Sequence, residues 1–244
     1  MAAPHRPSRF PWRDLLPAAG WLAVLGPLFF VVYGWCNAFT AQRTGVGSFY
    51  FAWERRIPFV PWMILPYMSI DLFFAGSFFL CRDRAQLRTH AARILLAIAL
   101  SAAGFLLFPL RYGWPRPAVD GWLGTVFAPL NALDQPFNLC PSLHISLRTI
   151  LWCVYGRSLR GWPWLRLAAQ GWFILIAVST LLVYQHHVID LLGGYLVAVV
   201  CCRLFPEKST GVFPEVFPES SPVLTLPCPS TSSTPPLPPA WRPS

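Results

Sequence analysis

The sequence contains little charge, and little of that charge is negative. Only 12% of its 244 residues are charged, and 10 Asp and Glu stand against 19 Lys and Arg. Because an ordinary soluble domain carries about 25% charged residues, this composition excludes that class of protein. The seven cysteines lack the paired spacing of a zinc site. A glycine-rich phosphate-binding loop, a Cys-x5-Arg signature and an internal repeat are also absent from the sequence.

Hydrophobic residues, in contrast, make up 55% of the chain. Apolar stretches of about twenty residues recur, and each is long enough to cross a bilayer core of roughly 30 Å. The clear stretches are 15–36, 59–81, 92–110, 165–184 and 187–204, and a shorter sixth stretch is 141–155. We therefore predict an all-α integral membrane protein, a bundle of six transmembrane helices.

The composition divides the chain into three parts. Residues 1–14 form a short N-terminal segment, predicted to be cytoplasmic, and residues 15–204 form the six-span domain. Residues 205–244 are rich in Pro, Ser and Thr. Because such a segment lacks the apolar periodicity needed to bury a core, we predict a disordered tail.

The placement of arginines predicts the orientation. They lie in short loops rather than on one basic face, so the formal charge of +9 does not indicate a nucleic-acid partner. Cytoplasmic loops of membrane proteins are enriched in Lys and Arg. Three segments rich in arginine would share the cytoplasmic side: Arg6, Arg9 and Arg13; Arg82, Arg84 and Arg88; Arg157 and Arg160. We predict a multi-pass protein of the plasma (inner) membrane whose other face looks outward.

The stretch VYQHHVIDLLGG, residues 183–194, places ionisable side chains in an apolar run. On a helix His186 and Asp190 share one face, so Asp190 would orient the imidazole as a nucleophile or base. An alternative is a His-Asp pair that only caps a helix or fixes packing. His187 would point about 100° away from His186, so we expect it to take an auxiliary hydrogen-bonding role.

Two further polar segments reach the same membrane face in the six-span topology. FPLRYGWPRP, residues 108–117, carries Arg111 and Arg116. NLCPSLHISLR, residues 138–148, carries Ser142, His144 and Arg148. Arginines, histidines and an aspartate are therefore predicted to converge near the outer interface.

These motifs resemble the type 2 phosphatidic acid phosphatase superfamily, which includes lipid phosphate phosphatases, vanadium haloperoxidases and inositol phosphorylceramide synthases. The matching positions are Arg116-Pro117, Pro141-Ser142-Leu143-His144, and Ser179 followed by His186 and Asp190. The resemblance covers residues 20–204 and is closest to the inositol phosphorylceramide synthase branch.

The sequence departs from this family at three positions. The family's lysine is Pro109, its glycine before the histidine is Leu143, and its arginine after the serine is Thr180. Two phosphate-binding cations are thus missing. Arg111 is the candidate to replace the lysine. Arg148, one helical turn past the motif histidine, is the candidate to replace the arginine, or else it is a packing arginine.

The resemblance implies phosphoryl transfer on a lipid without a metal or cofactor. His186 would attack phosphorus, Asp190 would hold its ring, and His144 would protonate the leaving alkoxide. The candidates to bind the phosphate are Arg116, Arg111, Ser142, Arg148 and Ser179. Resolution of the intermediate by water makes the enzyme a phosphatase, the interpretation preferred here. Resolution by an alcohol makes it a phosphotransferase, and the motifs do not separate the two.

Two other functions remain as alternatives. In one, His144, His186, His187 and Asp190 bind a metal in a hydrolase or oxidase, although the chain has only five histidines. In the other, the chain is a catalytically inactive transporter or scaffold, which the missing cations favour. The partners expected in every case are the bilayer and a phospholipid or lipid phosphate, and the sequence leaves the oligomeric state open.

Three more features carry expectations of their own. Asp71, inside the second apolar stretch, needs a partner, either Arg148 or a hydroxyl such as that of Ser69. Gly193 and Gly194 predict close helix packing. The aromatic-rich loop 48–62 either guides lipid head groups or anchors the fold.

Overall fold

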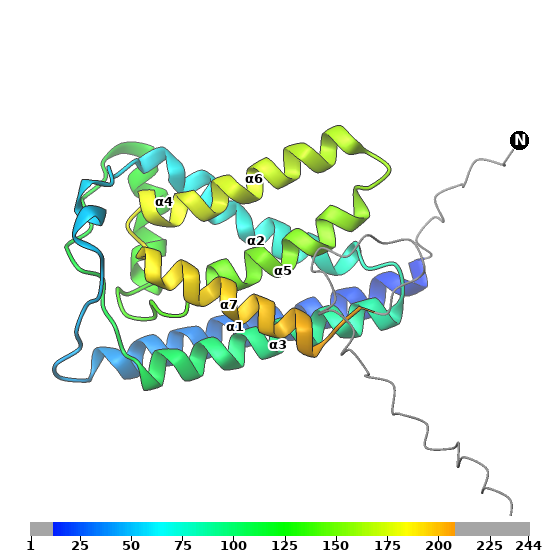
Figure 1. The fold of residues 1–244 in the computed structure, drawn as a ribbon, viewed down its shortest axis with the longest axis horizontal. Coiled ribbons are helices and arrows are strands. Elements are labelled where there is room, and N and C mark those ends of the chain that lie inside the picture. Colours follow the sequence, from blue (N-terminus) through cyan, green and yellow to red (C-terminus); the bar gives the residue numbers. More distant parts are fainter. Residues whose placement is uncertain (1–11, 208–244) are drawn as a thin grey trace, which may run out of the picture. The chain divides into compact units, whose positions relative to one another are not determined.

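The computed structural model describes residues 12–207 as a bundle of α-helices (Figure 1). The elements are α1 (Trp12–Ala41), η1 (Ala52–Arg56), η2 (Pro61–Met63), α2 (Ile64–Phe79), α3 (Arg84–Leu107), α4 (Gly121–Leu133), α5 (Leu143–Ser158), α6 (Pro163–Leu182) and α7 (Val188–Leu204). Within these residues the only β-type pairing is an isolated bridge between Gly47 and Leu110. The all-α prediction is confirmed. Residues 1–11 and 208–244 lie outside the described residues, and the second range contains all but the first three residues of the tail predicted from residue 205.

Helix α5 lies at the centre of the bundle, where it packs against α2, α3, α6 and α7. Helix α1 packs against α2 and α3, and α7 lies between α3 and α5 (Figure 1). Apolar side chains such as Ile94, Ile150, Leu151 and Phe173 are fully buried at these contacts. The helices that carry the polar motifs are therefore held by a shared core.

Local sequence determines where several helices begin. The Asp83 carboxylate accepts a hydrogen bond from the Gln86 amide at 2.8 Å, which caps α3. Pro163 occupies the first turn of α6, where a missing N–H costs nothing. The loops after α2 and α5 lie at one end of the bundle, where the Ser158 hydroxyl donates to the Leu80 carbonyl at 3.2 Å, and the polar motif segments lie at the other (Figure 1).

Four helical segments among the described residues are long and apolar enough to cross a membrane: Leu15–Ala41, Pro61–Phe79, Arg84–Leu107 and Pro163–Leu182. The prediction of six spans is not met by this measure. Helix α5 has 16 residues and α7 has 17, which at 1.5 Å per residue reach about 24 and 26 Å, short of a core of about 30 Å. A membrane protein is supported, with four clear spans and two shorter helices packed among them.

Helix α4 was not predicted from the sequence. It has only 13 residues, contains Pro129, and begins at Gly121, whose φ of +70° suits glycine. Its apolar face, including Leu123 and Phe127, packs in a small core with Ile64 of α2. The segment between α3 and α5 therefore contains a helix that packs on α2, rather than being a simple loop.

The close packing predicted for the glycine pair is present where α7 meets α5. A Cβ atom on Gly194 would collide with the carbonyl oxygen of Ser142 and lie 3.0 Å from the Cβ of Ile145. The Ser146 hydroxyl donates to the Gly194 carbonyl at 3.0 Å. This close approach positions the starts of α5 and α7 against each other, and both starts carry motif residues.

Candidate active site

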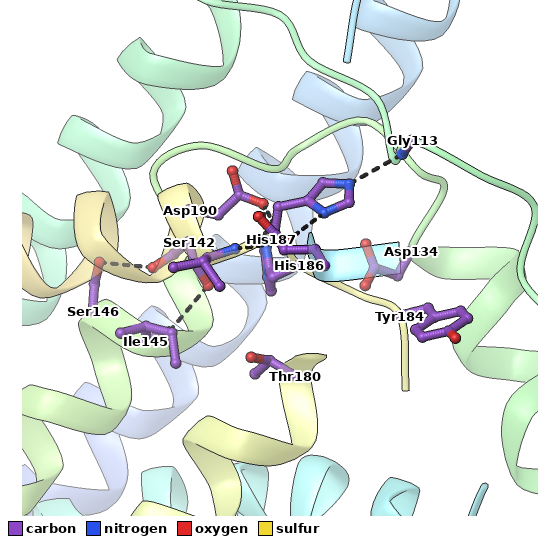
Figure 2. A network of polar contacts seen from close by, with 12 residues as sticks. Gly113, Asp134, Ser142, Ile145, Ser146, Thr180, Tyr184, His186, His187 and Asp190 are labelled. Atoms are coloured by element: carbon purple, nitrogen blue, oxygen red, sulfur yellow. Dashed lines mark hydrogen bonds and ion pairs between the residues drawn. The ribbon is translucent and has the colours of Figure 1, made fainter. Parts of the chain in front are cut away.

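Three segments far apart in the sequence meet at one end of the bundle: the loop after α3, the start of α5, and the turn between α6 and α7 (Figure 2). The Gly113 amide in the first segment donates to Nε2 of His187 in the third, at 3.1 Å. The Ser142 amide in the second donates to the Asp190 carbonyl at 3.0 Å. These hydrogen bonds hold the predicted motif segments together.

His186 lies in the turn before α7 and not on a helix, which corrects the sequence prediction. The helix begins at Val188, and the His186 amide donates to the Thr180 carbonyl at 3.2 Å. The imidazole is nevertheless buried beside Asp190, with 3.6 Å between Nδ1 and Oδ2. This is longer than a hydrogen bond, and Nδ1 has no hydrogen-bond partner among the described residues. Such distances commonly shorten when substrate binds.

Asp190 has two structural tasks besides facing His186. Its Oδ2 accepts a hydrogen bond from the His187 amide at 2.7 Å, which caps α7. Its backbone carbonyl accepts from Ser142, and its side chain is fully buried. The sequence offered helix capping and ring orientation as alternatives, but the structure shows that one carboxylate can cap the helix while lying beside the imidazole.

His144 is the second residue of α5, directly after the cap of that helix. Oγ of Ser142 accepts the Ile145 amide at 3.3 Å, while the Ser142 amide is engaged by Asp190. The His144 ring stacks on Tyr67 with 4.3 Å between centroids and 13° between planes. Its Nε2 is buried without a hydrogen-bond partner among the described residues. The stacking fixes the ring and leaves this nitrogen available to a ligand.

Arg116 joins the loop after α3 to both neighbouring segments. Its Nε donates to the Tyr184 carbonyl at 3.2 Å. Its Nη1 donates to the Asp134 carbonyl at 2.7 Å and to Asn131 Oδ1 at 3.3 Å. Because these partners belong to the turn before His186 and to the end of α4, Arg116 is the predicted phosphate-binding cation most firmly held near the histidines.

The other phosphate-binding candidates on these segments are placed differently. Arg111 is exposed, and its backbone amide pairs with the Gly47 carbonyl at 2.8 Å. Ser179 is buried in the last turn of α6, where its hydroxyl donates to the Ile176 carbonyl at 2.6 Å. Arg111 is free to move towards a ligand, whereas Ser179 is engaged by its own helix.

Arg148 lies away from the histidines. Its Nε donates to the Phe173 carbonyl of α6 at 2.7 Å, and its guanidinium lies 4.8 Å from the centroid of the Trp152 ring. One turn beyond His144, α5 already faces α6, which explains this direction. These contacts fit the packing alternative for Arg148, and Arg148 is not paired with Asp71, for which the sequence offered it as one of two partners.

An apolar cavity of about 420 Å³ opens beside the histidines. Its walls come from α1, α2, α4 and α5, and two of those helices are candidate membrane spans. The polar side chains that line it are His144, His186, Asp134, Tyr33, Tyr67 and Asp71, and the remainder are mostly Leu, Phe, Met and Gly. A cavity with apolar walls and a few polar groups suits an amphiphilic ligand.

Asp134 forms a buried polar cluster in this cavity. Its carboxylate accepts hydrogen bonds from the hydroxyls of Tyr33, at 2.5 Å, and Tyr67, at 3.4 Å. Tyr67 also stacks on His144, so the carboxylate lies close to the second histidine. A carboxylate offers about four lone-pair positions, so two hydrogen bonds leave it able to accept more.

His187 is held by hydrogen bonds at both ring nitrogens. Its Nδ1 lies 3.0 Å from Oε2 of Glu54, and its Nε2 accepts from the Gly113 amide. Burial lowers the pKa of His187, and the hydrogen bond to Glu54 opposes that shift. The neutral ring is therefore fixed in one tautomer, which agrees with the auxiliary hydrogen-bonding role expected from the sequence.

No group of three His, Cys, Asp or Glu side chains within residues 12–207 is arranged to hold a metal ion. The metal-site hypothesis needed ring nitrogens of His187, but Glu54 and Gly113 occupy both.

Sequence reasoning missed Glu54 and Asp134 as parts of the site. Each contacts partners about 100 or more positions away: Glu54 contacts His187, and Asp134 contacts Tyr33. No local spacing predicts such contacts. The available signal was rarity, since the chain has only 10 acidic residues.

Comparisons with known proteins agree with the motifs. No curated protein matches the chain significantly. Residues 62–204, more than half of the chain, match the PAP2 superfamily. This region begins at η2, ends with α7, and contains Arg116, His144 and His186. The chain therefore belongs to the PAP2 superfamily.

Proposed function

We propose that the protein is an integral membrane phosphatase that cleaves lipid phosphate esters through a phosphohistidine intermediate at His186, with no metal ion. The observation that carries this proposal is the cavity, where His144 and His186 from different segments line one apolar space beside candidate membrane spans. Such a space accepts a hydrocarbon chain while the ester is held at the histidines.

The first chemical step is an in-line attack by His186 on phosphorus. Nδ1 faces Asp190, so Nε2, on the opposite side of the ring, forms the bond to phosphorus as the bond to the leaving oxygen breaks. Asp190 keeps the ring in the required tautomer and stabilises the positive charge that develops on it.

His144 serves the leaving group and then the acceptor. In its protonated form it donates from Nε2 to the departing alkoxide, and in its neutral form it removes a proton from the attacking water. Arg116, Arg111 and the Ser142 hydroxyl would hold the equatorial oxygens as charge builds on them. Water then displaces His186 and releases inorganic phosphate.

The finer topology belongs to the same proposal. Helices α5 and α7 pack on one another and on α3, beside the four longer spans. With the arginine-rich loops after α2 and α5 in the cytoplasm, the histidines would lie near the outer face of the plasma membrane.

Turnover by the purified protein tests this function. With chelator present, a panel of lipid phosphates should give inorganic phosphate and the dephosphorylated lipid, and His186→Ala should abolish the reaction. No turnover of any lipid phosphate by the wild-type protein would contradict the proposal and favour an inactive scaffold or transporter.

A second candidate is a phosphotransferase of the inositol phosphorylceramide synthase type, in which an alcohol replaces water. The observation that favours it is Asp134, whose carboxylate lines the cavity next to Tyr67 and His144. It could accept a hydrogen bond from an alcohol hydroxyl and hold that group near His144.

Product analysis by mass spectrometry separates the two functions. Added diacylglycerol or inositol should give a new phosphodiester if an alcohol is the acceptor. Asp134→Asn should then lower the ratio of transfer to hydrolysis, since the amide offers fewer acceptor positions. Inorganic phosphate as the sole phosphorus product, with every alcohol tried, would leave the phosphatase function.

A further inference from the structure

We infer that Glu54 and His187 form a positioning pair that holds the nucleophile turn and the phosphate-binding loop in register. The inference rests on the proposed function for the role of His186 and Arg116. Neither member of the pair contacts the reacting atoms, so both are positioning residues rather than catalytic ones.

The Glu54 carboxylate, in η1, is buried and accepts three hydrogen bonds. Oε1 accepts the Phe51 amide at 2.9 Å. Oε2 accepts Nδ1–H of His187 at 3.0 Å and the Val188 amide at 3.1 Å. The exposed fraction of Glu54 is 1% and that of His187 is 0%, which is costly for an acidic group unless it is fully bonded. The loop before α2 is thus bound to the start of α7 by one carboxylate.

The hydrogen bonds assign the tautomer of His187. The Gly113 amide can only donate, so Nε2 must accept and carries no proton. Nδ1 therefore carries the proton and donates it to Glu54. Tyr112 stacks on the ring at 4.2 Å and 7°, and Trp114 meets it edge-on at 5.0 Å. The ring is fixed on its faces as well as at both nitrogens.

The pair connects the phosphate-binding loop with the turn that carries the nucleophile. Through Gly113 it holds the loop that carries Arg116. Through its backbone amide, His187 donates to the Asp190 carboxylate, which faces His186 at 3.6 Å. The nucleophile, its orienting carboxylate and the phosphate-binding arginine are therefore aligned through one residue, His187.

The pair also accounts for the aromatic loop 48–62, for which the sequence left two interpretations open. The loop is anchored on the motif segments: besides Glu54, the Ile57 carbonyl accepts the Tyr184 hydroxyl at 2.8 Å, and the Val60 amide donates to the Leu182 carbonyl at 2.8 Å. The loop belongs to the site even though it precedes the region that matches the family.

Glu54→Gln tests the pair with almost no change in shape. All three partners of Glu54 are donors, and glutamine offers one acceptor oxygen and one donor NH₂. If the NH₂ faces His187, the ring must take the other tautomer, and Nε2–H then opposes the Gly113 amide. If the NH₂ faces the Phe51 amide instead, two donors oppose each other there, and the hydrogen bond that holds the start of η1 is lost. We expect the rate of phosphoenzyme formation per active site to fall about 10- to 100-fold, as misplacement near 1 Å does.

Active sites are counted by the burst of phosphoenzyme, so a loss of folded protein does not imitate the effect. Asp83→Asn is the matched control, the same change at the opposite end of the bundle, where Asn caps α3 as well as Asp does. It should leave the rate per site unchanged. A Glu54→Gln protein with the wild-type rate per site would overturn the positioning pair, even if its yield were low.

A second variant separates the effects of the two hydrogen bonds that the His187 ring makes, one with Glu54 and one with Gly113. His187→Asn keeps an amide donor close to the position of Nδ1, for Glu54, and removes the acceptor for Gly113. Because the loop that carries Arg116 is then released, KM should rise more than kcat falls. A fall in kcat alone, with KM unchanged, would contradict the link through Gly113.

¹⁵N NMR of histidine-labelled protein reports which ring nitrogen of His187 carries the proton, and it needs no turnover. The His187 signals, identified by their absence in His187→Asn, should show a protonated Nδ1 and an unprotonated Nε2, and Glu54→Gln should disturb this pattern. A wild-type His187 protonated at Nε2 overturns the inference. If wild-type protein formed no phosphoenzyme, the proposed function would fail, while this measurement would still decide the pair.

Discussion

His186 and His187 are neighbours in the chain, yet their surroundings prepare them for different tasks. His187 is hydrogen-bonded at both ring nitrogens and packed between aromatic rings, so its tautomer is fixed. His186 is buried with Nδ1 facing Asp190 at 3.6 Å, which leaves Nε2 for the attack proposed above. A nucleophile needs a nitrogen that is oriented but not consumed, and among these two rings only His186 meets that condition.

The roles of the two cavity histidines can be separated by the leaving group. His144→Ala should slow cleavage most for alkyl phosphates, because a poor leaving group needs the proton that His144 donates. An activated aryl phosphate leaves without that proton, so it should restore much of the activity of His144→Ala and little of that of His186→Ala. The measurement is kcat/KM for both substrates with both variants. Equal rescue would show that the assigned roles are wrong.

The contact between α5 and α7 sets the distance between the two histidines, because each helix starts within two residues of one of them. Gly194 permits that contact, since a Cβ there would collide with the Ser142 carbonyl oxygen. Backbone atoms cannot move aside as a flexible side chain can. The distance between α5 and α7 therefore depends on glycine at position 194.

Gly194→Ala should push α7 away from α5. We expect a loss of about 1 to 3 kcal/mol of stability, the usual cost of overpacking, together with reduced activity. Thermal unfolding in detergent and turnover measure the two effects. Gly171→Ala on α6, where a Cβ meets nothing within 4 Å, is the control and should be neutral or slightly stabilising. Similar melting temperatures for both variants would contradict the tight packing of α7 on α5 at Gly194.

Helix α1 forms one wall of the cavity, although it lies outside the region that matches the family. Gly26 lines this wall, and a Cβ there meets nothing within 4 Å. Gly26→Leu should fill part of the cavity, lowering kcat/KM for long-chain lipid phosphates about 10-fold while leaving a short aryl phosphate unaffected, because about 25 cal/mol per Å² of apolar contact is lost.

The control for this variant is Gly20→Leu, which lies on the same helix, has the same open surroundings and does not line the cavity. It should leave both substrates unaffected. An equal loss for long and short substrates with Gly26→Leu would show that the cavity does not hold the hydrocarbon chain.

Across the whole molecule, the apolar runs predicted the helices well and the details of the site less well. Runs of apolar residues were enough to predict α1, α2, α3, α5, α6 and α7. The order of three motifs predicted segments that do lie together, since His144 and His186 line one cavity and Arg116 donates to the Tyr184 carbonyl. Helix α4 was missed because its 13 residues are too few to cross a bilayer, and because glycines and Pro129 within it disfavour a helix. Contacts such as that of Glu54 with His187 depend on packing between distant segments, which no local pattern encodes.

The orientation of the bundle follows from its arginines and can be tested in intact cells. Single cysteines at the positions of Arg84 and Arg160 should resist a membrane-impermeant thiol reagent, because arginine-rich loops stay in the cytoplasm. Because Arg111 is exposed on the opposite end of the bundle, a cysteine there should react. Labelling at position 84 but not at position 111 would invert the topology.

The most direct test of the whole account is the covalent intermediate. Rapid acid-free quenching of the wild-type protein during turnover of a ³²P-labelled lipid phosphate, followed by peptide mapping, should place the label on His186. The label should persist in Asp134→Asn and be absent from His186→Ala. Label on any other residue, or retained labelling in His186→Ala, would contradict the proposed mechanism.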